Sequence, residues 1–158
     1  MSKDVWIETK TPKGKGVEAL TKAKGAFVKV GILSGTGEHP KAKHGQTIAE
    51  VGWWNEFGTT KDGSVHIPAR PFLRTGLNDN LPRYRGLFKT VIKNVLLKRI
   101  STDQAVFVIG STAVADVQAK ITAINSPPNA QLTIDRKGSS NPLIDTGALR
   151  QHINWAKV

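Results

Sequence analysis

The clearest pattern of hydrophobic and polar positions lies in the second half of the chain. Over residues 81–100, apolar side chains recur every three or four positions, which predicts a long amphipathic helix. Ser101 and Gln104 follow at the spacing of a capping box, in which each of the two side chains caps a backbone amide. A second helix is therefore expected to begin at Ser101 and to end before Pro127 and Pro128.

Shorter helices are predicted at several other places. Residues 47–57 carry apolar side chains at helix-like intervals before Gly58, and residues 17–24 show a weaker pattern of the same kind. Pro71 can begin a helix, because its fixed φ angle suits the first helical position. Near the C-terminus, Asp145 can cap a short helix that contains Leu149.

Strands are predicted where β-branched and aromatic residues gather, or where apolar and polar residues alternate. Residues 26–33 show this best, while residues 131–135 and 153–158 alternate and residues 5–7 can form a short strand. The prolines of residues 67–71 favour extended backbone. The polar segments are expected to be loops, and they are residues 38–45, 59–64 and 136–141.

These elements indicate an α+β fold, with a small, mostly antiparallel sheet packed against a long amphipathic helix pair. Short additional helices and extended loops complete it. At 158 residues, the chain has room for one ordinary domain. We expect residues 17–158 to form this domain, and residues 1–16 to be a basic flexible segment or an edge strand.

Positive charge is in marked excess. The net charge is +11, and such a field attracts polyanions, chiefly nucleic acid. A lysine-rich solvated surface that complements an acidic neighbour explains the charge equally well. The polar face of the predicted 81–100 helix carries a cluster of cations, namely Arg83, Arg85, Lys89, Lys93, Lys98 and Arg99.

The residues of catalytic and metal sites do not fall into working patterns. There are no cysteines, and the four histidines do not lie at metal-ligand spacing. No acid pair, nucleophile elbow or phosphate-binding loop is recognisable. We therefore expect no enzyme activity, no metal and no cofactor. We also expect no membrane partner, because no window reaches the roughly 18 apolar residues of a membrane helix.

Three sequence blocks resemble a known family. Trp54-Asn-Glu-Phe-Gly-Thr59 is followed, after a short loop, by Ile67-Pro-Ala-Arg-Pro-Phe-Leu-Arg74 and then by the predicted long helix. Near the C-terminus stands Pro142-Leu-Ile-Asp-Thr-Gly-Ala-Leu-Arg150. In this order the blocks resemble the neck or tail-completion family of tailed phages and prophages, whose members are also described as minor tail or virion morphogenesis proteins.

The resemblance implies a structural protein of the virion, made in the host cytoplasm, without enzyme activity. Such a subunit is expected to form a closed ring, as a hexamer, that joins the tail to the head. Its expected partners are other copies of itself, the head connector or head-completion protein, the tail terminator or tail tube protein, and genome DNA passing through the channel. A tail terminator of the same junction and a basic nucleic-acid-binding regulatory protein are the alternatives.

The first two blocks also suit docking on physical grounds, because rigid apolar groups and planar arginine forks favour interfaces. The expected interface residues are Trp54, Asn55, Glu56, Phe57, Arg70, Pro71, Phe72 and Arg74. An equal alternative is that Phe57 and Phe72 close the core of one subunit. In a ring, the basic helix face would line the channel, with DNA-facing residues Arg83, Arg85, Lys89 and Lys93.

Overall fold

The computed structural model describes residues 28–33, 35, 37–41 and 45–158. The predicted strand at residues 5–7, the predicted helix at residues 17–24 and the basic N-terminal segment lie outside this range. Within it, the elements in chain order are β1 (Val28–Ile32), α2 (Ile48–Phe57), β2 (Thr59–Lys61), β3 (Ser64–Ile67), α3 (Phe72–Asn78), α4 (Leu81–Leu96), α5 (Thr102–Ala123), α6 (Gln131–Lys137), α7 (Ala148–Gln151) and β4 (Ile153–Lys157).

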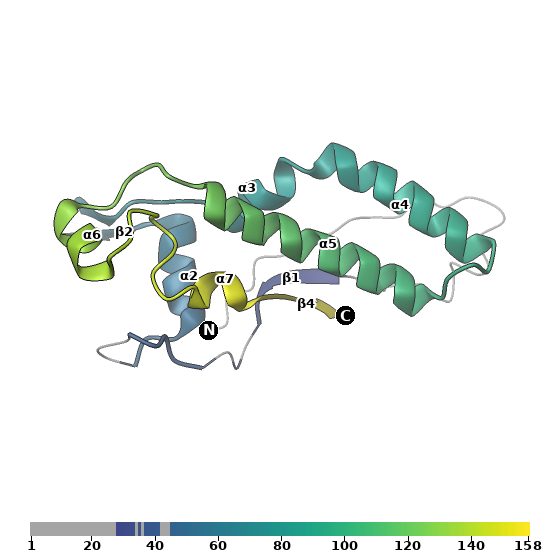
Figure 1. Ribbon diagram of the computed structural model, residues 1–158, viewed down its shortest axis with the longest axis horizontal. Helices are drawn as coiled ribbons and strands as arrows, with labels where there is room; N and C mark the ends of the chain where they lie inside the picture. Colours follow the sequence, from purple (N-terminus) through teal and green to yellow (C-terminus); the bar gives the residue numbers. More distant parts are fainter. Residues whose placement is uncertain (1–27, 34, 36, 42–44) are drawn as a thin grey trace.

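The fold is α+β, as the pattern predicts, and α5 runs through its centre. The antiparallel pair β1–β4 lies along α5, and α3 and α4 also contact α5. Figure 1 shows α4 and α5 side by side at one end of the molecule, with α2 and α6 toward the other. The main core combines residues from distant parts of the sequence, namely Phe72, Val117, Ile121, Leu143, Leu149 and Ile153.

Capping boxes begin both α2 and α5, of which the sequence pattern predicted the one at Ser101. The Thr47 hydroxyl accepts a hydrogen bond from the Glu50 amide, and the Glu50 carboxylate accepts one from the Thr47 amide. Ser101 and Gln104 form the same reciprocal pair at the start of α5. Both helices therefore start with their first amides satisfied locally, before any tertiary packing.

Two segments differ from the prediction. Residues 59–64, expected to be a loop, belong to the β2–β3 hairpin, whose turn has Asp62 and Gly63 at φ 52° and 77°. Residues 131–135, expected to be a strand, lie in α6, which ends at the left-handed Gly138. Asp145 does not cap α7, because the residue that precedes this helix is Gly147.

Helix α5 is apolar enough to bear on the expectation about membranes. Among the described residues, α5 is the one helix whose length and composition would allow it to span a membrane. A central helix of a folded domain passes the same test, and α5 contacts both strands of the β1–β4 pair. Its apolar composition reflects a buried face, which includes Val117 and Ile121, and exposed apolar residues such as Phe107.

Gly110 lets α5 pass close over β4. A β-carbon placed on Gly110 would lie 2.3 Å from Cδ2 of Trp155. We expect Gly110→Ala to lower the free energy of unfolding by about 1–3 kcal/mol, because the indole must move out of a packed position. Chemical denaturation measures this change.

Gly86 in α4 provides the matched control, because a β-carbon there meets nothing within 4 Å. Gly86→Ala should raise the free energy of unfolding by about 0.5–1 kcal/mol, since alanine restricts the unfolded chain and favours the helix. Equal effects of the two substitutions would contradict the close packing of α5 on β4.

Candidate docking site

The three blocks that resemble the phage family meet in space although they are far apart in the sequence. Phe72 of the second block lies in the same core cluster as Leu143 and Leu149 of the third. The first block ends α2, and α2 contacts both α3 and α7. The blocks therefore form one packed unit around the start of α3.

Glu56 of the first block caps helix α3 of the second. The residue is 4% exposed, and its carboxylate accepts hydrogen bonds from the amides of Leu73 at 2.9 Å and Arg74 at 3.1 Å. Pro71, which precedes α3, supplies no side-chain cap. The Glu56 carboxylate, which belongs to α2, caps α3 in its place. Its negative charge is favoured at the positive N-terminal end of α3.

Arg70 is the other buried charged residue of this unit, with 4% of its surface exposed. Its Nε donates to the Pro127 carbonyl at 2.7 Å, and its Nη2 donates to the Pro128 carbonyl at 3.1 Å. Its backbone amide donates to the Asn55 carbonyl at 2.6 Å. Arg70 thus ties the end of α2 to the segment between α5 and α6.

Gly58 allows the chain to turn sharply between α2 and the hairpin. Its φ angle is +75°, and a β-carbon there would lie 2.9 Å from both the Ala69 nitrogen and the Ile67 oxygen. Both neighbours are backbone atoms, so they could not move aside to make room for a β-carbon. The glycine of the first block is therefore required by the geometry that holds the second block beside it.

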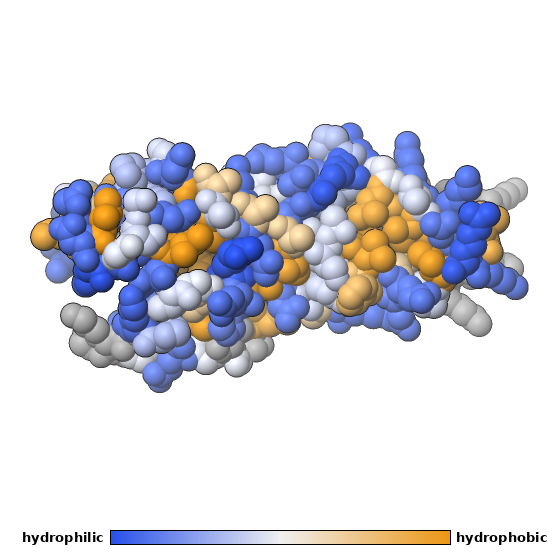
Figure 2. Space-filling view, viewed as in Figure 1, coloured by the Kyte–Doolittle hydropathy of each residue, from blue (hydrophilic) through white to orange (hydrophobic). Residues whose placement is uncertain are grey.

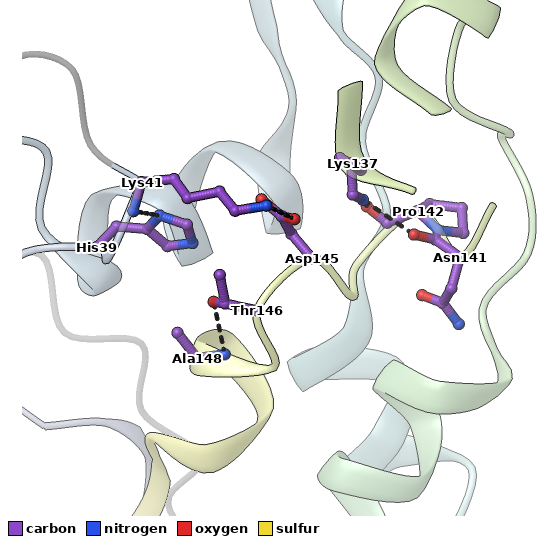
Figure 3. Close-up of polar contacts among 8 residues, drawn as sticks. All are labelled: His39, Lys41, Lys137, Asn141, Pro142, Asp145, Thr146 and Ala148. Carbon is purple, nitrogen blue, oxygen red and sulfur yellow. Dashed lines mark hydrogen bonds and ion pairs between the residues drawn. The ribbon is translucent and has the colours of Figure 1, made fainter. Parts of the chain in front are cut away.

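The third block is held by local hydrogen bonds and by one long-range ion pair. Asn141 Oδ1 accepts from the amides of Leu143 and Ile144, at 3.0 and 3.1 Å. Asp145 Oδ1 and Lys41 Nζ form an ion pair at 2.6 Å, which is drawn as a dashed line in Figure 3. The ion pair joins this block to the segment that precedes α2.

The structure places three of the expected interface residues inside the subunit. Glu56, Arg70 and Phe72 are each 4% exposed or less, so they fold the blocks together and do not present a surface. For Phe72 this is the core role that the sequence left as the alternative. Trp54, Asn55 and Pro71 are half-buried, which leaves Phe57 and Arg74 as the exposed members of the set.

Phe57 and Arg74 form a surface cluster with Trp53, which we call the aromatic cluster. The ring centroids of Trp53 and Phe57 are 4.2 Å apart, and the Arg74 guanidinium lies 5.6 Å from the Phe57 ring centroid. The four-residue spacing of Trp53 and Phe57 on one helix was the signal for this contact. An aromatic pair beside an arginine is a composition enriched at protein interfaces.

The comparisons with known proteins are negative. No family model, curated protein or solved structure matches this chain. The resemblance carried by the three blocks therefore remains a prediction.

The basic residues of α4 divide into two groups. Arg83 forms an ion pair with Asp116 of α5, and the Tyr84 hydroxyl donates to the same carboxylate at 2.6 Å. Burial and this hydrogen bond raise the pKa of Tyr84, so its hydroxyl keeps its proton. Arg85, Lys89 and Lys93 are exposed and make no ion pair with any residue that the structure describes.

The part of the chain that the structure describes contains no cluster of three or more metal-binding side chains. Five ion pairs and the capping carboxylates Glu50 and Glu56 engage part of its charged residues. What this arrangement can do chemically is present an exposed aromatic cluster and free cations on a rigid frame, which is the chemistry of docking.

Proposed function

We propose that this chain is a structural subunit of the head-to-tail junction of a tailed phage, in the neck or tail-completion position. The observation that carries the proposal is the convergence of the three family-like blocks into one unit. Glu56 contacts the backbone of the second block, and Phe72 packs with Leu143 and Leu149 of the third. These contacts support the proposal because the three blocks that carry the resemblance form one packed unit of the fold.

The surface supports a role in assembly. Large apolar side chains remain exposed at the end where α4 and α5 meet, including Leu97 at 51% and Phe107 at 60%. Figure 2 shows apolar residues gathered over α4 and α5 on the face in view. Exposed apolar surface of this kind is typical of protein contacts. In a ring, a neighbouring copy would cover it.

The mass of the purified protein tests the ring. We expect an assembly of several copies, six by the family resemblance, either alone or after mixing with head connector or tail tube protein. Native mass spectrometry reports the number of copies directly. A strict monomer under all of these conditions would contradict a ring subunit.

A nucleic-acid-binding regulator is the second candidate, favoured by the free cations of α4. In the ring the same cations would face the DNA that passes through the channel. Both candidates predict salt-dependent binding to DNA, but only the regulator predicts tight binding by one subunit with a strong sequence preference.

A double variant tests whether α4 contacts DNA. Lys89→Gln combined with Lys93→Gln should reduce the slope of log affinity against log salt concentration by about 2, since each lost phosphate contact removes about 0.9. The matched control is Lys61→Gln combined with Arg150→Gln, two exposed cations on other elements. Identical slopes for the two double variants would show that DNA does not contact α4 in particular.

A further inference from the structure

A cleft of about 460 Å³ lies beside the three blocks, between α2, the β2–β3 hairpin, α6 and the loop before α7. This volume is in the range of ligand-binding pockets. Part of its wall is visible in Figure 3, where Lys137 and Asp145 come from different segments. The charged side chains in the wall are mostly cationic, and those that matter here are Arg70, Arg136, Lys137 and Asp145.

Arg70 brings a buried cation to this cleft without a carboxylate to balance it. Its Nε and Nη2 donate to carbonyl and amide oxygens of residues 127–129. Its Nη1 makes no hydrogen bond to any described residue. Burial lowers the pKa of Arg70, which reflects the cost of holding the charge away from water.

Lys137 is a second half-buried cation in the same wall. Its Nζ donates to the carbonyls of Asn141 at 3.0 Å and Pro142 at 3.2 Å, which leaves one of its three N–H bonds without a described partner. Burial lowers the pKa of Lys137, and the nearby Arg70 acts in the same direction, against the opposing effect of Asp145. Arg70 and Lys137 therefore place two like charges in the wall of one cleft.

The acid and amide in the wall do not relieve this excess. Asp145 is already engaged at 2.6 Å by Lys41 from outside the cleft. Asn129 Nδ2 is a buried donor with no acceptor among the described residues. Buried donors and buried cations normally have partners. Asp145, already paired with Lys41, is therefore the one carboxylate among the lining residues, against the three cations Arg70, Arg136 and Lys137.

We propose that this cleft binds a carboxylate side chain of an acidic peptide segment from a partner protein. The carboxylate would accept hydrogen bonds from Lys137 and from Arg70 Nη1, with Arg136 at the rim. Apolar wall residues, including Pro68, Pro128 and Leu149, would contact the methylene groups of an Asp or Glu side chain. The partner's place at the phage junction rests on the proposed function, but the binding itself does not.

A peptide fits this site better than duplex DNA. Arg70 is 4% exposed, so only a group that enters the cleft can reach it. The phosphates of a duplex are attached to a broad, stiff surface, whereas a side chain extends from its backbone by several bonds. The free cations of α4 lie on another element and offer DNA a more open surface.

Binding of a blocked tetraglutamate peptide to the purified full-length protein tests the proposal. Calorimetry should show saturable binding that Lys137→Gln weakens tenfold or more. Lys93→Gln removes the same charge from exposed α4 and should weaken binding less than twofold. Arg136→Gln, at the exposed rim, should weaken peptide binding three- to tenfold. This variant tests the proposal if Lys137→Gln fails to fold.

Three results would overturn the proposal. Equal losses for the cleft and α4 variants would reduce the binding to general attraction by the net charge. Binding of inorganic phosphate but not of tetraglutamate would assign the cleft to a phosphate group. Absence of saturable binding would remove the site, and if the protein still formed rings, the proposed function would stand without it.

Discussion

Phe72→Ala is expected to lower the free energy of unfolding by about 3–5 kcal/mol, the usual cost of removing a large buried aromatic ring. The ring is 2% exposed and packs in the core cluster that joins the second and third blocks to α5. Its loss leaves a cavity where residues from distant parts of the chain meet. Urea denaturation followed by circular dichroism measures the change, and assembly should decline as the folded fraction falls.

Phe57→Ala is the matched control. Phe57 lies in the first block and Phe72 in the second, but Phe57 is 39% exposed and belongs to the aromatic cluster. Its replacement should cost about 1 kcal/mol or less, as for surface residues in general, while weakening assembly of the folded protein. If Phe57→Ala destabilised the fold as much as Phe72→Ala, the division between core and docking residues would be wrong.

Glu56→Ala is expected to lower the free energy of unfolding by about 2–4 kcal/mol. The substitution leaves the amides of Leu73 and Arg74 without their acceptor at the buried start of α3. Each unsatisfied buried donor costs about 1–3 kcal/mol. Thermal and urea denaturation should agree on the loss, and amide hydrogen exchange at Leu73 and Arg74 should accelerate.

Glu56→Gln separates the shape of this side chain from its charge. Glutamine keeps one acceptor oxygen and should recover part of the loss. Asp103→Asn provides a baseline. The Asp103 side chain is 81% exposed in the first turn of α5, so this substitution should change the free energy of unfolding only slightly. A Glu56→Ala protein as stable as Asp103→Asn would show that the carboxylate does not cap α3.

The starts of α2 and α5 were predictable because their signals are local. The capping pairs at Thr47 and Ser101 satisfy the first amides within three residues, and the sequence shows both. The β2–β3 hairpin was also predictable but was missed, because Asp62-Gly63 is a strong turn signal when β-branched residues flank it. The polar character of residues 59–64 outweighed that signal in the prediction.

Helix α6 was predicted as a strand because four or five alternating residues do not distinguish the two structures. In the structure, the left-handed Gly138 ends a helix whose last turn carries Arg136 and Lys137. Both features are ordinary helix-ending signals. They lie after the alternating residues, in a segment that was interpreted as a loop.

The site itself could be predicted only in part. Sequence resemblance selected the blocks. Whether a residue in them serves the core or the surface depends on its exposure, which is set by contacts with residues far along the chain. Arg70 is buried because its acceptors lie near residue 128, which no local pattern indicates. Arg83 likewise pairs with Asp116 across two helices. The basic cluster of α4 is thus smaller than the sequence suggested.

Electron microscopy of phage particles made without this chain tests the central claim most directly. Disrupting its coding sequence in its native genome should leave filled heads and complete tails that do not join. Supplying the protein in trans, or adding it purified to the separate parts, should restore joined particles, whereas the destabilised Phe72→Ala protein should restore fewer of them. Joined particles in normal numbers without the chain would contradict its role at the junction.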